Sequence, residues 1–72
     1  MKYLVNIVWD DEASVYIATS DEVPGLVLES GSFDALIEKV RFAIPEILKL
    51  NNKTAVLDLT FVSERHCKVS NG

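Results

Sequence analysis

From residue 33 onward, apolar side chains recur every three or four positions, and this spacing constrains the fold more than any other feature of the sequence. It places the apolar residues on one face of an α-helix. The residues on that face are Phe33, Leu36, Ile37, Val40, Ala43, Ile44, Ile47 and Leu48. The sequence therefore predicts one amphipathic helix that packs against another layer of structure.

Both ends of this helix carry residues with known capping preferences. The Ser32 side chain can accept a hydrogen bond from an unpaired amide of the first turn, where Asp34 suits the positive end of the helix dipole. Asn51 and Asn52 tolerate the left-handed conformation that often ends a helix. Pro45 has no amide hydrogen, and a proline in a helix interior costs roughly 3 kcal/mol. We therefore expect a kink or break there, with Pro45 opening a second short helical segment.

Four further segments have the composition and alternation of β-strands. They span residues 2–9, 14–20 and 26–29 before the helix and residues 54–63 after it. The Pro24-Gly25 pair predicts a tight turn before the third strand, because proline fixes one backbone angle and glycine permits a positive one. The order β-β-β-α-β predicts an α+β domain: a three-stranded antiparallel meander, a helix on one face and a final strand that returns to the sheet.

A single helix covers only one face of such a sheet, so the other face needs a different cover. The apolar residues that we expect on that other face are Leu4, Val8, Tyr16, Val27, Val56 and Val62. A chain of 72 residues has little interior, yet 49% of its residues are hydrophobic, and a surplus of this kind marks an interaction surface. We therefore expect another chain on this face or on an edge strand, with a homodimer as the simplest assembly.

Phe42 is a second candidate contact residue. At about 100° per residue it lies roughly opposite the apolar stripe of the helix, among charged side chains and beside Ala35. Aromatic residues ringed by charged ones are favoured interface centres. The alternative is that Pro45 turns the helix enough to bury Phe42, or that a lone exposed aromatic residue has no role.

Composition excludes several classes of function. Seven basic and eleven acidic residues give a net charge of -4, and the basic residues are scattered, so we expect no nucleic-acid partner. The single cysteine cannot form an internal disulfide, and no apolar run reaches the ~20 residues of a membrane span. Because no signal-peptide pattern follows Met1, we expect a cytoplasmic protein with no membrane partner. Residues 1–72 form a single predicted domain, ordered over 2–63, with a mobile tail at 64–72.

Two carboxylate clusters raise the question of magnesium-dependent catalysis. They are Asp10-Asp11-Glu12 and Asp21-Glu22. Two-metal catalysis needs carboxylates that project into one pocket from neighbouring elements, whereas both clusters fall in predicted hairpin turns. We interpret them as solvated turn residues, with a minimal metal-dependent nuclease as the less favoured alternative. His66-Cys67 offers too few ligands for zinc and no positioned base for a cysteine nucleophile, so we expect no metal, cofactor or catalytic residue.

The stretches VNIVWDDEASVYIATSDEVPGL and LIEKVRFAIPEILKLN carry a resemblance over residues 3–66. They resemble a bacterial family of short proteins of unknown function, most specifically in Pro-Glu-Ile-Leu-Lys-Leu-Asn at residues 45–51. That family is similar in fold to the amino-terminal domain of the HicB antitoxins, a reduced ribonuclease-H-like β-β-β-α-β unit. In HicB systems this domain binds and silences a small ribonuclease toxin, HicA, and a separate carboxy-terminal segment binds operator DNA. The sequence ends soon after the last predicted strand, so we expect no DNA-binding half here.

The resemblance and the residues together predict a non-enzymatic protein-interaction module. It resembles HicB antitoxin domains, and the partner that this resemblance implies is a small basic ribonuclease toxin, whose charge the acidic chain would complement. The alternative from a different class is an orphan structural or regulatory protein that associates only with itself.

Overall fold

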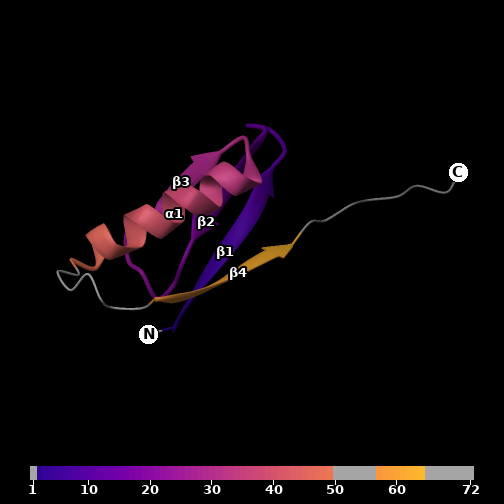
Figure 1. Ribbon diagram of the computed structural model, residues 1–72. Coiled ribbons are helices and arrows are strands. Elements are labelled where there is room, and N and C mark those ends of the chain that lie inside the picture. The colour runs from indigo at the N-terminus through magenta and orange to yellow at the C-terminus, as the bar shows by residue number, and fades with distance from the viewer. Residues whose placement is uncertain (1, 50–56, 65–72) are drawn as a thin grey trace, which may run out of the picture.

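The computed structural model describes residues 2–49 and 57–64, which form a four-stranded mixed sheet with one helix packed on it (Figure 1). The elements, in chain order, are β1 (Lys2–Asp10), β2 (Val15–Thr19), β3 (Val27–Ser30), α1 (Phe33–Ile47) and β4 (Asp58–Glu64). The predicted α+β class and the order β-β-β-α-β are confirmed. Val56 and most of the predicted tail lie outside the described residues.

The strands lie side by side in the order β3-β2-β1-β4. β1, β2 and β3 form an antiparallel meander, whereas β4 runs parallel to β1, with Lys2 opposite Asp58 and Val5 opposite Phe61. A parallel return needs a long crossover, and the connection that contains α1 supplies it between β3 and β4. β1 is therefore an inner strand, and β3 and β4 are the two edges.

The turn into β3 and the start of α1 form as the local sequence predicts. Gly25 has a φ of 87°, and the Leu26 amide donates to the Val23 carbonyl at 3.2 Å, which closes the Pro-Gly turn. Ser32 precedes α1 with extended backbone angles, and its hydroxyl accepts from the Ala35 amide at 3.3 Å. This cap fixes the point at which the chain changes from strand to helix.

The expected break at Pro45 is wrong, because α1 runs through this residue to Ile47 without a second helical segment. Pro45 lies in the last turn, so its missing amide leaves a single carbonyl, that of Arg41, without its usual partner, and only two helical residues follow the proline. In the turn that follows α1, Lys49 has a φ of 55°, and its amide donates to the Glu46 carbonyl at 3.1 Å. The left-handed stop therefore comes at Lys49, before the Asn51-Asn52 pair that we expected to supply it.

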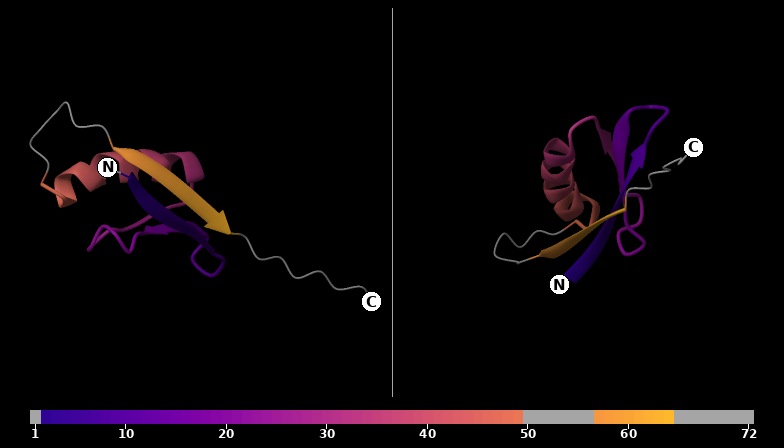
Figure 2. Two further views of the ribbon diagram at one scale, coloured as in Figure 1. Left: turned by 90° about the horizontal axis from the view of Figure 1, so that it is seen from below. Right: turned by 90° about the vertical axis from the view of Figure 1, so that its right-hand side faces the viewer.

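The core lies between α1 and the sheet face that it covers. The fully buried residues are Val5, Ile7, Ala18, Val23, Leu26, Leu36, Val40 and Ile44. α1 contributes the last three, which belong to the predicted apolar stripe. Its backbone lies over β2 and β3 rather than over β4 (Figures 1 and 2). We call the face under α1 the inner face and the opposite face the outer face.

The placement of Tyr16 on the outer face is wrong. Tyr16 pairs with Trp9 in the β1–β2 register, and its ring lies 4.7 Å from the Trp9 ring and 5.3 Å from the ring of Phe33 on α1, measured between centroids. Tyr16 and Ala18 therefore face the helix, and Val15 and Ile17 occupy the outer face of β2. Contacts between aromatic rings at these distances favour this arrangement.

Side chains complete the pairing of β1 where β2 has ended. The Ser20 hydroxyl donates to the Leu4 carbonyl at 2.7 Å, and a Glu22 carboxylate oxygen accepts from the Leu4 amide at 2.8 Å. Both backbone groups of Leu4 are thereby satisfied without a neighbouring strand on that side. The loop after β2 is tied to the central strand at this point.

We predict that Leu36→Ala lowers the free energy of unfolding by about 3 kcal/mol, because a fully buried leucine leaves a cavity when truncated. Phe42→Ala is the matched control on the same helix, and its effect stays within about 0.5 kcal/mol since the ring is mostly exposed. Urea unfolding followed by circular dichroism measures both values. Equal losses in the two variants would contradict the described orientation of α1.

We also predict that Glu22→Ala lowers the free energy of unfolding by about 1 kcal/mol, because the Leu4 amide loses a charged acceptor. Asp21→Ala removes the same charge from the same loop and serves as the control. The same urea titration compares them. A loss as large in Asp21→Ala would show that net charge, rather than the bond to Leu4, is responsible.

Candidate interaction surface

The outer face of the sheet carries exposed apolar side chains from three strands. Leu4 and Val8 on β1 are 43% and 55% exposed, Val27 on β3 is 69% exposed and Val62 on β4 is 44% exposed. Ile17 joins them, because it lies opposite Val8 in the β1–β2 register. Four of the six residues that we expected on this face therefore lie there and are exposed to solvent.

Phe42 is also exposed, at 74%, but on the far side of α1 from the sheet. Ala35 is exposed on the same helix. The ion pair nearby in sequence joins Arg41 to Glu38 at 2.8 Å, with both side chains more than half exposed, and a pair of this kind contributes little stability. The candidate residues thus divide between two sides of the molecule, and one flat partner cannot contact both sides at once.

Charge is distributed unevenly between the meander and the helix segment. The segment 2–30, which forms β1, β2, β3 and their turns, carries one basic residue, Lys2. Its acidic residues are Asp10, Asp11, Glu12, Asp21, Glu22 and Glu29. On the helix segment 33–49, three acidic residues balance three basic ones: Asp34, Glu38 and Glu46 against Lys39, Arg41 and Lys49. The meander is therefore acidic, and the helix segment is neutral overall.

The two predicted carboxylate clusters lie at opposite ends of β2, because one precedes this strand and the other follows it. Asp10 accepts from the Glu12 amide at 3.0 Å and the Ala13 amide at 3.3 Å, and Asp11 accepts from the Trp9 indole at 3.2 Å. Within residues 2–49 and 57–64, no three acidic, histidine or cysteine side chains gather as a metal site would require. His66 and Cys67 lie outside these ranges.

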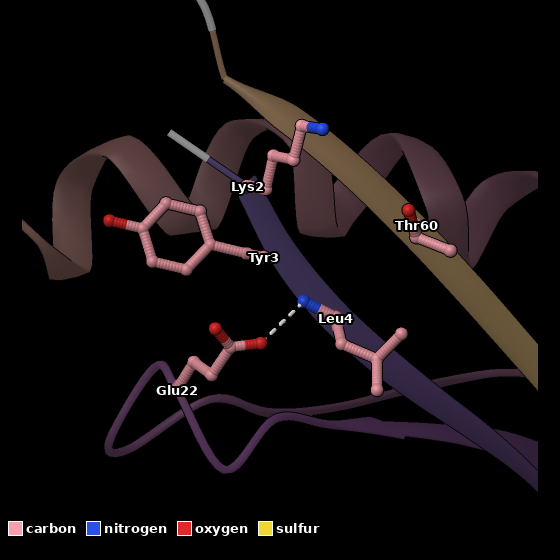
Figure 3. A pocket seen from close by; sticks show the side chains of 5 residues that line it. All are labelled: Lys2, Tyr3, Leu4, Glu22 and Thr60. Atoms are coloured by element: carbon pink, nitrogen blue, oxygen red, sulfur yellow. Dashed lines mark hydrogen bonds between the residues drawn. The ribbon is translucent and has the colours of Figure 1, made fainter.

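A shallow hollow of about 230 Å³ lies beside the start of β1 (Figure 3). Its lining residues are Lys2, Tyr3, Leu4, Glu22 and Thr60. In Figure 3 the Glu22 carboxylate points toward the Leu4 amide, which it binds. The hollow is smaller than the ~300–1,000 Å³ of ordinary ligand pockets. We therefore treat it as a shallow surface depression rather than as a ligand site.

Two sets of hydrogen bonds between distant parts of the chain were not predicted from the sequence. One is the pair of hydrogen bonds at Leu4, whose carbonyl accepts from the Ser20 hydroxyl and whose amide donates to the Glu22 carboxylate. The other is a bond from the Lys39 ammonium to the Glu29 carbonyl at 3.3 Å. Both join residues at least ten positions apart, and no local periodicity or turn signal marks such pairs. Among the described residues, no helix combines the length and apolarity of a membrane span.

Comparison with known proteins places the chain among small domains without an assigned activity. The crystal structure of a hypothetical protein, TTHA1013, from the extremely thermophilic bacterium Thermus thermophilus superposes with a TM-score of 0.79. The two sequences are 31% identical, and the match covers 96% of this chain and 100% of the other. A search of curated proteins finds no significant match.

One sequence family matches nearly the whole chain. The match runs over residues 2–69, which include all five elements of the fold. The chain therefore belongs to the family described as Domain of unknown function (DUF1902).

Proposed function

We propose that this protein is a non-enzymatic, cytoplasmic binding module of the HicB antitoxin type, which holds a small basic ribonuclease toxin against the outer face of its sheet. The observation that carries the proposal is the exposure of Leu4, Val8, Val27 and Val62 on one face that α1 does not cover. Apolar residues gathered on one exposed face mark an interaction site in a soluble protein.

Charge supports a basic partner. The meander that bears three of these four residues has six carboxylates and one lysine in its segment 2–30. Complementary potentials steer a cationic protein toward such a surface and disfavour acidic partners. A basic toxin would meet apolar side chains at the centre of the contact and carboxylates around it.

The outer face fits this role better than the region around Phe42. Phe42 offers one ring on a helix whose six charged neighbours in segment 33–49 cancel. The outer face combines several apolar side chains with excess negative charge. An interface of ordinary size buries about 800 Å² on each partner, which a sheet face supplies more readily than one exposed ring.

The carboxylates support a binding role over a nuclease role. Asp10 and Asp11 already accept hydrogen bonds from the turn that follows β1 and from Trp9, and Glu22 accepts one from β1 itself. Through these bonds the acidic residues hold the turns at opposite ends of β2. Self-association, the alternative function, is favoured by a different feature, the edge at β4, and pairing along that edge leaves Leu4, Val8 and Val27 of the outer face open to a toxin.

We predict that the tagged chain captures, from its source cell, a small basic protein that arrests growth when expressed by itself. Coexpression of the chain relieves the arrest. The variant Val8→Lys places a cation at the centre of the outer face and loses this relief, whereas the control Phe42→Lys, also exposed but on α1, retains it.

Colony counts after induction of the captured protein measure both variants. Relief by Val8→Lys together with loss in Phe42→Lys would move the binding site to the helix. The absence of any captured protein that arrests growth would refute the toxin-binding function.

A further inference from the structure

The two edges of the sheet differ in how their backbones are protected. β3 has four residues, and the Lys39 ammonium from α1 donates to its Glu29 carbonyl at 3.3 Å. The Ser30 hydroxyl also accepts from the Ser32 amide at 3.2 Å, where the chain leaves the strand. Short edge strands and lysine side chains are common means by which proteins prevent a further strand from adding.

β4 is longer, with seven residues, and its pairing in the described structure is with β1 alone. On an edge strand, alternate residues direct their amide and carbonyl groups away from the sheet. None of the hydrogen bonds found within residues 2–49 and 57–64 reaches the far side of β4 from a side chain, as Lys39 does at β3. Among the residues that the structure describes, β4 therefore offers the longer and less protected edge.

The apolar side chains of β4 are also incompletely covered. Leu59 and Phe61 face inward, opposite Tyr3 and Val5, yet both are only partly buried because α1 lies over the other half of the sheet. Val62 on the outer face is 44% exposed. An added strand would satisfy the backbone edge and cover apolar surface on both faces in one step.

We propose that β4 pairs antiparallel with β4 of a second copy of this chain, about a two-fold axis perpendicular to the sheet at Thr60, so that two sheets join into one of eight strands. A second copy fits this edge because it has the same uncovered inner surface. A two-fold axis perpendicular to the sheet makes the two β4 strands antiparallel and keeps both helices on the same side.

The side chains select the register. With Thr60 on the axis, Leu59 lies opposite Phe61 of the second copy on the inner face. By symmetry, Phe61 of the first copy lies opposite Leu59 of the second. On the outer face Thr60 lies opposite itself. Aliphatic–aromatic and threonine–threonine neighbours are favourable cross-strand pairs. Moving the axis to Phe61 would instead set Leu59 opposite Ser63 twice and keep only one apolar pair on the inner face, Phe61 opposite itself.

Light scattering on the purified chain tests this pairing. The chain mass is 8.0 kDa, and we expect the wild type to have twice that mass. Thr60→Lys and Thr60→Asp each place like charges on the axis and are expected to give the monomer mass. Thr60 is exposed in the single chain, so circular dichroism should show that both variants stay folded.

The decisive experiment is to mix the Thr60→Lys and Thr60→Asp variants and measure the mass of the mixture. Lys at position 60 of one copy then lies opposite Asp of the other, and we expect the dimer mass to return. Thr19→Lys, the same change on the inner strand β2, and Phe42→Lys on α1 are the controls, and both are expected to remain dimeric. A variant Thr60→Cys in a Cys67→Ser background should also form a disulfide-linked dimer in air.

Several results would overturn the proposal. A monomeric wild type excludes the pairing, and so does a Thr60→Lys variant that keeps the dimer mass. A monomeric Phe42→Lys variant would place the interface on α1 instead. A mixture of Lys and Asp variants that stays monomeric, with no cross-linking of Thr60→Cys, would refute the Thr60 register. None of these measurements involves a toxin, so their outcome is independent of the proposed function.

Discussion

Packing of one helix against one face of a four-stranded sheet is the constraint on which the rest of the structure depends. An α-helix with its side chains is about 10 Å wide, and neighbouring strands lie about 4.8 Å apart, so one helix covers about two strands. Leu36, Val40 and Ile44 lie along the buried side of α1, and α1 lies over β2 and β3. This limit leaves two parts of the sheet that α1 does not cover: the outer face, and part of the inner face of β4.

The sequence predicted most of the fold because its local signals agree with one another. The stripe that begins at Phe33 has a cap at Ser32, and the Pro24-Gly25 turn separates two alternating segments. The failures have physical causes. β2 has apolar residues on both sides, so alternation could not show that Tyr16 rather than Ile17 faces α1; the register with Trp9 decides this. Pro45 is tolerated because the helix ends within a turn of it.

The candidate surface was predictable only in part. Leu4, Val8, Val27 and Val62 were assigned correctly because strand alternation relates each of them to a buried or partly buried neighbour. Once the helix was placed, the distribution of charge between the meander and the helix segment could also be inferred from the sequence. The bonds of Glu22 to Leu4 and of Lys39 to Glu29 depend on how distant loops meet the sheet, and only the three-dimensional structure reveals them. These same bonds distinguish the protected parts of the sheet from the unprotected ones.

The parallel pairing of β4 with β1 has a consequence for the order of folding. Lys2 lies opposite Asp58, so closing this pair restricts almost the entire intervening chain, whereas β1, β2 and β3 pair through short turns. Loop-closure entropy rises with the length of chain enclosed, and pairings between distant segments form slowly. The meander and α1 can therefore assemble first, with β4 adding last. A chain that has not yet added β4 leaves one edge of β1 open. In the final folding step, the chain's own β4 and the β4 of a neighbouring chain compete to pair with that edge.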